Sequence, residues 1–220
     1  MPLERDQIKA VLDTLAPEGN VRLELAPVER VSRNCPRAWQ NLITRETAEI
    51  RQSLPTTWGP MANRLPQTVA AWQNILQGVA YLTTDQRPPS LLYFYRRGTE
   101  IFAYRGYAPV ELSRPETNSL PPAISEVYKV HNGLIDVFSW AMGPLPEVDW
   151  HYLSDDPTTP AGSFLVLFNN GGGASVGFDL SEEPALSYVV WPDDPPNLAP
   201  DFWGAIDDWM ASGLKGADPA

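Results

Sequence analysis

Apolar residues in the C-terminal half of the chain follow a pattern of strand, turn and strand. Phe164 to Phe168 form an unbroken apolar run, which predicts a strand that is buried on both faces. In the stretch Val176 to Leu180, apolar residues alternate with Gly177 and Asp179, which predicts a strand with one buried face. We therefore predict a hairpin over Ser163 to Leu180 and expect the fold to be built around it.

The glycines between these two strands are predicted to form the hairpin turn. A phosphate-binding loop would need a helix to begin directly after the glycines, so that free backbone amides face the anion. The residues after Gly173 have a strand pattern instead, and no Lys-Ser or Lys-Thr pair follows them. Glycine also suits the positive φ angles of a tight hairpin turn.

Helical spacing of apolar residues dominates the first 80 residues. It predicts one helix over Leu3 to Ala16, a second over Arg37 to Leu54 that Pro55 ends, and a third that begins at Pro66 and keeps Val79 on its inner face. The tryptophans at helical spacing could line a ligand pocket, but packing in the core explains them more simply.

The remaining elements are predicted from shorter patterns. They are a short strand at Val21 to Leu25, a hairpin that joins Leu91 to Tyr95 with Ile101 to Tyr104, a helix within Leu120 to Leu134, a strand at Leu186 to Trp191 and a closing helix over Leu198 to Met210. In the closing helix the apolar stripe leaves Asp201, Asp207 and Asp208 facing outward. Ser113 to Leu120 is the predicted linker between two halves of the chain.

Length and composition indicate an ordinary globular protein. The chain has 220 residues, enough for one large domain or two small ones, and its single cysteine, Cys35, excludes an internal disulfide. The first residues lack the apolar run of a signal peptide, and no apolar segment reaches the roughly 20 residues that a membrane span needs. We therefore expect a soluble, cytoplasmic protein that does not bind membranes.

Acidic residues are concentrated in the second half of the chain. Residues 111–220 contain 17 Asp and Glu but only 3 Lys and Arg, and the net charge of the whole chain is −11. Such a surface repels phosphates, which argues against nucleic acid and favours a basic protein partner; the acidity could also serve solubility alone. The candidate partner-binding residues are Glu147, Asp149, Asp155, Asp156, Asp193, Asp194, Asp207 and Asp208.

The sequence offers little for catalysis. Its only histidines, His131 and His151, are 20 positions apart, and no motif of a metalloprotease, a serine hydrolase or a paired-cysteine site is present. His131 follows a predicted helix end, where a partly cationic ring is favourable. Adjacent acids could hold a metal, but neighbouring carboxylates on a strand or helix point in different directions. We therefore predict a binding protein with no catalytic residue, metal or cofactor.

The second half also resembles a known family in the order of its turns and core positions. A helix that begins at Leu120-Pro121 and ends at Asn132-Gly133 comes first, followed by the acidic loop Glu147 to Asp156, the hairpin with its GFDL ending and the closing helix LAPDFWGAIDDWM. This pattern, over residues 113 to 214, resembles proteins of the SUKH (Smi1/Knr4-like) superfamily.

The resemblance has consequences for domains, fold and function. It implies a SUKH-like domain over residues 113–220, after an α+β extension over residues 1–112, and an α+β fold with a mainly antiparallel sheet flanked by helices. It also implies a bacterial immunity protein that neutralises a cognate polymorphic toxin by direct binding. Two alternatives remain open: a regulatory scaffold protein, as in other members of the family, and an uncharacterised hydrolase.

Overall fold

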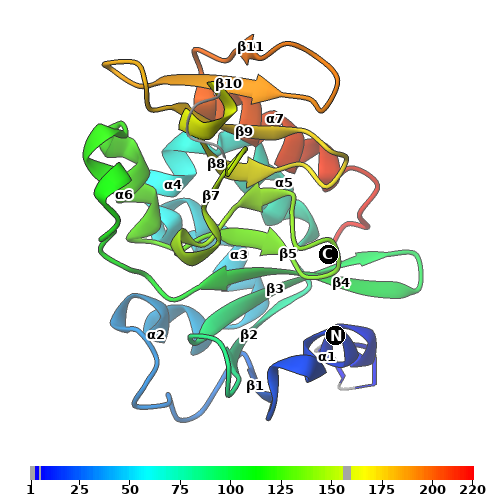
Figure 1. Cartoon of the computed structure of the whole chain (residues 1–220). Helices are drawn as coiled ribbons and strands as arrows, with labels where there is room; N and C mark the ends of the chain where they lie inside the picture. The colour runs from blue at the N-terminus through cyan, green and yellow to red at the C-terminus, as the bar shows by residue number, and fades with distance from the viewer. Residues whose placement is uncertain (1–2, 5, 156–159) are drawn as a thin grey trace.

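The protein is an α+β structure in which helices pack on two antiparallel sheets (Figure 1), as the sequence predicted. A computed structural model describes residues 3–4, 6–155 and 160–220. Within this part of the chain the α-helices are α1 (Lys9–Leu15), α2 (Arg37–Ile43), α3 (Thr47–Trp58), α4 (Pro60–Arg64), α5 (Pro66–Ile75), α6 (Pro122–Tyr128) and α7 (Phe202–Gly213). Short 3-10 helices are η1 (Ala16–Glu18), η2 (Pro115–Ser119), η3 (Glu147–Asp149) and η4 (Pro160–Ser163).

The first sheet, sheet A, has its strands in chain order. It consists of β1 (Arg22–Leu25), β2 (Gly78–Thr83), β3 (Ser90–Arg97), β4 (Glu100–Tyr107) and β5 (Leu134–Asp136). Alternate residues of β2 and β3 enter two different cores. Val79 and Tyr93 pack with the helices α2, α3 and α5, whereas Ala80 and Phe94 pack with α1 on the opposite face. Both faces of sheet A are therefore covered by helices.

The second sheet, sheet B, contains the predicted hairpin. It consists of β6 (Gly143–Pro144), β7 (His151–Tyr152), β8 (Phe164–Asn169), β9 (Ser175–Asp179), β10 (Leu186–Val190) and β11 (Asn197–Leu198), in the order β11-β10-β9-β8-β6 with β7 also paired to β8. β8 and β9 pair antiparallel, which confirms the hairpin. Helix α7 packs on this sheet, since the Phe202 ring lies 4.7 Å from that of Phe178 and the Trp209 ring lies 5.5 Å from that of Phe168.

The predicted helix over Arg37 to Leu54 is wrong in both its continuity and its end. The chain breaks between α2 and α3, where the Glu46 and Glu49 side chains form a capping box at the start of α3. Pro55 lies inside α3 and has no N–H for the carbonyl one turn earlier. That carbonyl, of Arg51, accepts from the Gln73 side-chain amide at 3.3 Å instead, so the helix continues to Trp58.

Other predicted elements have corrected limits. Val79 lies in β2 and not on the third helix, because α5 ends at Ile75 and strand pairing begins at Gly78. The first helix is shorter than predicted, and the linker Ser113 to Leu120 contains η2.

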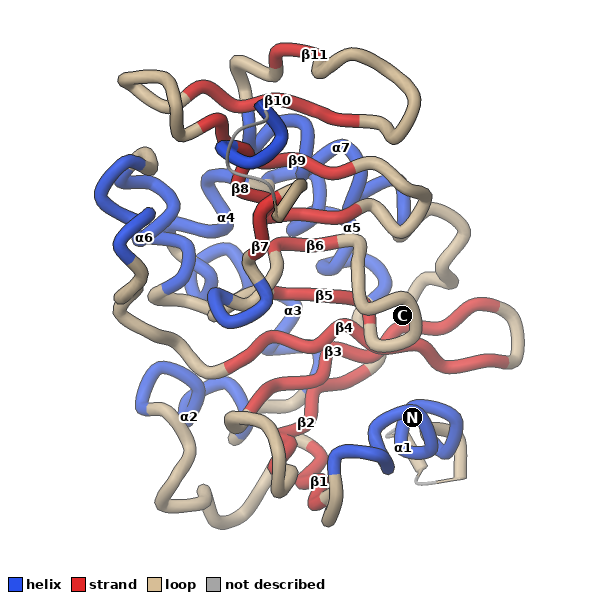
Figure 2. The backbone as a smooth tube through the Cα atoms, in the orientation of Figure 1, coloured by secondary structure: helices blue, strands red, loops and turns tan. Residues whose placement is uncertain are grey.

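The division of the chain near residue 112 does not separate two cores. β5 comes from the second half of the chain and pairs with β4 of the first half, with Ile135 opposite Arg105. Helix α7 packs against α5, and one hydrophobic core contains side chains from both halves. The strands follow one another from β1 to β11 across the molecule in Figure 2. The N-terminal residues are therefore an integral part of the structure that holds sheet B.

An aromatic cluster with one histidine fills the core beneath sheet A. The indole N–H of Trp58 donates to the Tyr93 hydroxyl at 3.1 Å, and the Tyr93 oxygen lies 2.8 Å from Nε2 of His131. Trp39 and Trp72 pack on the same rings and are buried, which confirms that the tryptophans belong to the core. The prediction of a partly cationic His131 is wrong, because burial lowers its pKa to about 4 and keeps the ring neutral.

We predict that His131 makes the stability of the protein depend on pH. An unfolded histidine has a pKa near 6.5, so the unfolded chain binds more protons than the folded chain between that pH and about 4. The contribution of the neutral His131 to the free energy of unfolding is fully present above pH 6.5. As the pH falls through about 4, the protein loses about 3 kcal/mol of stability from this group. Urea unfolding of the wild type and of His131→Gln at pH 7 and pH 4.5 measures this difference. An equal loss in both proteins would contradict the prediction.

Candidate functional site

The eight predicted partner-binding acids do not form one continuous face. Glu147 and Asp149 lie on η3, Asp193 and Asp194 lie on the turn between β10 and β11, and Asp207 and Asp208 lie on α7. Asp155 is exposed after β7, and Asp156 lies outside the described residues. The acids therefore belong to separate elements, and the contacts of each decide whether it is available to a partner.

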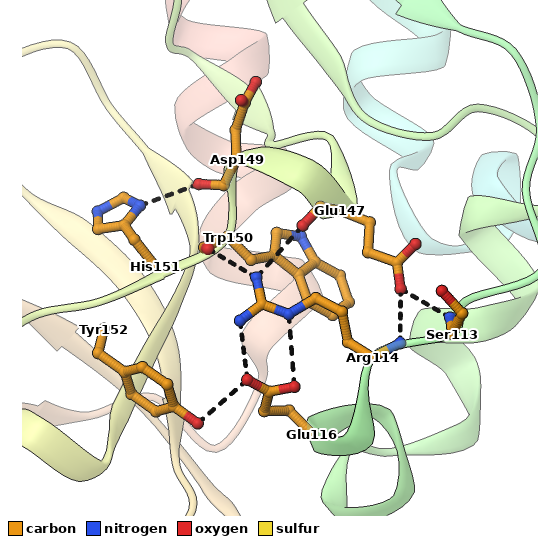
Figure 3. A network of polar contacts seen from close by, with 8 residues as sticks. All are labelled: Ser113, Arg114, Glu116, Glu147, Asp149, Trp150, His151 and Tyr152. Carbon is orange, nitrogen blue, oxygen red and sulfur yellow. Dashed lines mark hydrogen bonds and ion pairs between the residues drawn. The ribbon is translucent and has the colours of Figure 1, made fainter. Parts of the chain in front are cut away.

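Glu147 is occupied by the chain itself. Its carboxylate accepts hydrogen bonds from the backbone amides of Ser113 at 2.7 Å and Arg114 at 2.9 Å (Figure 3). Asp149 forms an ion pair with Arg87 at 3.5 Å. Glu147 thus holds the predicted linker against η3, and Asp149 contacts the loop between β2 and β3. This part of the acidic loop therefore has a structural role.

Arg114 is the centre of the network in Figure 3. Its guanidinium forms an ion pair with Glu116 at 2.8 Å and donates to the Trp150 carbonyl oxygen at 2.7 Å. The Tyr152 hydroxyl donates to the same Glu116 carboxylate at 3.2 Å. The hydrogen bond from Arg114 is the largest single factor that lowers the pKa of Glu116. The network joins η2 to β7 and leaves Arg114 little capacity for a ligand.

A groove of about 650 Å³ opens beside this network, next to the start of β8. Its lining includes the exposed His151 and the serines Ser163 and Ser181. Ser163 and Ser181 both donate to the Asp179 carboxylate, at 2.8 Å and 2.7 Å. His151 is 3.0 Å from the Asp149 carbonyl oxygen through Nδ1. The serine hydroxyls thus serve to fix Asp179, and neither is hydrogen-bonded to a histidine as a serine nucleophile requires.

The prediction that Asp207 faces outward is wrong. Its side chain is buried, and its two carboxylate oxygens accept from the backbone amides of Gln67 at 2.9 Å and Thr68 at 2.8 Å. These amides belong to the first turn of α5, where they lack partners within the helix. Asp208 is exposed, but it accepts a hydrogen bond from the side chain of the same Gln67. Both acids therefore join α7 to the start of α5.

A signal for the position of Asp207 is present in the sequence. Trp203, Asp207, Met210 and Leu214 follow one another at helical spacing, so Asp207 lies in the same stripe as buried apolar residues. A carboxylate in such a stripe must find hydrogen-bond donors, and the amides of a neighbouring helix start are suitable donors. Which helix supplies those donors is determined only by the packing of α7 on α5.

Asp193 and Asp194 remain available to a partner. Both are exposed, and among the described residues neither carboxylate has an ion-pair or hydrogen-bond partner. Three large apolar side chains are exposed on the same two-stranded unit: Leu186 at 38%, Trp191 at 37% and Leu198 at 57%. We call these five residues, Leu186, Trp191, Asp193, Asp194 and Leu198, the ribbon surface. Large apolar side chains that stay exposed on one small unit of the fold make it a candidate interaction site.

A groove of about 630 Å³ continues from the ribbon surface toward α6 and α7. Leu186 and Leu198 form one wall, and Phe202 and Trp203 at the start of α7 form another. The α6 start contributes Pro121 and Pro122, and the polar side chains at the groove include Glu126 and Asp201. Two members of the ribbon surface, Leu186 and Leu198, therefore line a mostly apolar groove whose charged lining residues are Arg64, Glu126 and Asp201.

The single cysteine and one of the two histidines are buried. His131 is buried and neutral, and burial raises the pKa of the Cys35 thiol to about 11, so the nucleophilic thiolate is not formed at neutral pH. The part of the chain that the structure describes holds no group of three or more His, Cys, Asp or Glu side chains placed to bind a metal. In the same part, none of the helices has the length and apolar character of a membrane span.

No protein-family model, curated protein or solved structure matches the chain. The geometry of the ribbon surface and the chemistry of its side chains therefore carry the functional interpretation. Asp193 and Asp194 were among the predicted partner-binding residues and are exposed, whereas the three apolar members of the ribbon surface were not predicted. The strand pattern of Leu186 to Trp191 showed which residues alternate, but it could not show that a two-residue edge strand, β11, leaves Leu198 exposed.

Proposed function

We propose that this protein neutralises a basic toxin protein by direct binding, the activity implied by its resemblance to SUKH immunity proteins. The ribbon surface is the contact region in this proposal. The observation that carries it is that one two-stranded unit, β10 and β11 with the turn between them, presents two exposed acids, Asp193 and Asp194, which are unpaired among the described residues, and three exposed apolar side chains. An apolar centre with a charged margin is the usual composition of a protein–protein interface.

The charge of the second half supports a basic partner. Residues 111–220 contain 17 acidic and 3 basic residues, and complementary charge raises the rate at which a specific partner associates. Trp191 and Leu198 then supply apolar area, which sets the rate of dissociation once the complex has formed. The two kinds of residue on the ribbon surface therefore have separable kinetic roles.

The proposal is tested by expressing the protein together with a toxin domain encoded next to its gene. We expect the protein to protect the host cell and to form a stable one-to-one complex with that domain in gel filtration. Growth arrest despite soluble expression, with no complex detected, would contradict the proposal. A pull-down that returns several host proteins and no toxin would support the regulatory scaffold instead.

We predict that replacing Asp193 and Asp194 with Asn slows association with the toxin domain by about tenfold at low salt, because electrostatic steering accelerates association by roughly 10- to 1000-fold. Stopped-flow measurements at low and high salt should also show a weaker salt dependence. Neither acid has a partner within the described chain, so the melting temperature should not change. Asp207 and Asp208 are left intact because they hold α5.

The matched control replaces Asp6 and Asp13 with Asn. These acids are exposed at and before α1, which covers sheet A at the other end of the molecule in Figure 1, and the change in net charge is the same. We expect association close to the wild-type rate. Equal slowing by both pairs would show that the total charge matters and that the ribbon surface does not. Leu198→Ala should increase the dissociation rate without changing association.

A further inference from the structure

A further cavity, of about 390 Å³, lies away from the ribbon surface, where sheet A meets the end of α7. It is lined by Tyr95 and Arg97 at the end of β3, by residues at the start of β4, and by the segment after β5. Four of its lining side chains are aromatic: Tyr95, Phe102, Tyr104 and Phe138. Its volume lies in the range of sites that bind small molecules, and such sites are mainly apolar with a few polar groups.

Arg97 brings an unpaired positive charge to this cavity. Its guanidinium carbon lies 5.5 Å from the centre of the Tyr95 ring and 5.7 Å from that of Phe102, and Nη2 donates to the Gly213 carbonyl oxygen. Among the described residues no carboxylate forms an ion pair with Arg97, and its buried Nε has no hydrogen-bond partner. A guanidinium in this state suits a carboxylate ligand, which it can bind through two nitrogens.

Asp136 brings a negative charge to the same cavity. Its Oδ1 accepts from the amides of Phe138 at 3.1 Å and Ser139 at 2.9 Å and from the Ser139 hydroxyl at 3.1 Å. Among the described residues its Oδ2 accepts only from the Tyr95 hydroxyl, at 3.4 Å, and so keeps capacity for a stronger donor. The carboxylate is not paired with Arg97, so the cavity holds two separate, opposite charges.

Tyr104 adds a third polar group. Its hydroxyl has no hydrogen-bond partner among the described residues, although the side chain is almost fully buried and lines the cavity. Burial is the main factor that raises the pKa of Tyr104, and the Asp136 charge adds to it, so the hydroxyl remains a proton donor at neutral pH. A hydroxyl that lines the cavity without a partner in the described part of the chain is free to donate to a ligand or to water.

The segment after β5 is held in an unusual conformation that forms the mouth of the cavity. Trp140 and Met142 have φ angles of 52° and 60°, which side chains of their size rarely adopt. The Trp140 amide donates to the Asp136 carbonyl oxygen at 3.0 Å, and the Met142 amide donates to that of Asn169 at 2.7 Å. Strained backbone that is fixed by the surrounding structure is concentrated at functional sites. Here the conformation places Phe138 against Phe102, with 5.3 Å between ring centres.

We propose that this cavity binds a free α-amino acid with an aromatic side chain. The carboxylate of the ligand meets Arg97 and the Tyr104 hydroxyl, its ammonium group meets Oδ2 of Asp136, and its ring packs against the Phe102–Phe138 pair from the cavity side. A zwitterion satisfies both unpaired charges at once, whereas an aromatic residue within a peptide chain carries neither charge. The cavity shares no residue with the ribbon surface, so this assignment does not depend on the proposed function.

The test is calorimetric titration of the full chain with L-phenylalanine, 3-phenylpropionate and N-acetyl-L-phenylalaninamide. We expect saturable binding of L-phenylalanine and at least about tenfold weaker binding of the other two, because each lacks at least one charge-assisted hydrogen bond. Equal binding of 3-phenylpropionate would overturn the role of Asp136 and the zwitterion assignment. Tighter binding of the amide would show that the cavity takes a peptide side chain. Absence of binding of all three at millimolar concentration would overturn the proposal.

Two substitutions locate the site. Arg97→Gln is expected to weaken L-phenylalanine binding at least tenfold, while Arg96→Gln, one residue away but outside the cavity lining, should leave it unchanged. Tyr104→Phe removes only the unpaired hydroxyl and should weaken binding by a few fold in a protein with an unchanged circular dichroism spectrum. If Arg97→Gln alters the fold, the Tyr104→Phe titration decides. If both variants are folded and both bind L-phenylalanine with wild-type affinity, the ligand binds elsewhere.

Discussion

Replacement of Leu167 with Asp is expected to unfold the whole protein at 25 °C. Leu167 is 1% exposed and lies in β8, between the two residues where the pairing with β9 shifts register. A carboxylate at this position would be buried without a partner, which costs several kcal/mol, and the apolar contacts of the leucine would be lost as well. The total stability of a domain is only about 5–15 kcal/mol. Because one core joins both halves, the N-terminal helices should unfold with sheet B.

Circular dichroism and urea unfolding measure this effect, and Leu198→Asp is the matched control. Leu198 lies in the same sheet but is 57% exposed, so its replacement introduces the same carboxylate at little cost. We expect a cooperative transition close to the wild-type midpoint for Leu198→Asp and no folded baseline for Leu167→Asp. A soluble Leu167→Asp protein with an unchanged midpoint would show that the core is not built on β8 as described.

Replacement of Glu18 with Ala is expected to lower the free energy of unfolding by about 3–5 kcal/mol, the range for breaking a buried ion pair from one side. Glu18 lies 2.6 Å from Nη1 of Arg105, whose side chain is fully buried in β4. The Thr84 hydroxyl also donates to Glu18, and Arg105 donates to Ser90. Without the carboxylate, the Arg105 charge stays in the core with one hydroxyl partner and the Tyr107 ring.

The double variant Glu18→Met with Arg105→Met separates the lost charge pair from lost packing. Removing both charges leaves no uncompensated ion, so we expect stability closer to the wild type than in Glu18→Ala. Replacing the exposed Glu29 with Ala is the control for general loss of acidity. If urea unfolding gives Glu18→Ala a loss below about 1 kcal/mol, as for surface pairs, then Glu18 and Arg105 are hydrated in solution.

Elements with a complete local signal could be predicted from the sequence. The hairpin of β8 and β9 was found because an unbroken apolar run, a glycine turn and an alternating run each point to the same structure. The hairpin of β3 and β4 was also predicted, from two short strand patterns joined through residues 96–100, although both strands extend beyond the predicted limits. Predicted helix limits were wrong where a tertiary contact replaced a local one. At Pro55, which has no N–H, the Gln73 side chain of α5 donates to the Arg51 carbonyl oxygen instead.

The candidate site could be predicted only in part. Charge counts correctly indicated an acidic second half, and Asp193 and Asp194 are exposed as expected. Charge alone did not distinguish these acids from Glu147 and Asp207, which accept hydrogen bonds from backbone amides far away in the chain. A carboxylate is equally polar in both situations. What differs is whether the fold brings an unpaired donor within reach, and sequence spacing does not contain that information.

The sequence by itself determined the two hairpins and the acidity of the second half, because period-two alternation and net charge are local properties of the chain. The α+β class was implied by the order of turns and core positions in the second half. The tertiary structure decided which of those charges remain free for a partner. It also brought Arg97, Tyr104 and Asp136 to one cavity, although they come from three strands of sheet A. Pairing of β4 with β5 across the expected domain boundary makes that juxtaposition, and such long-range pairing depends on the whole core and not on any single segment.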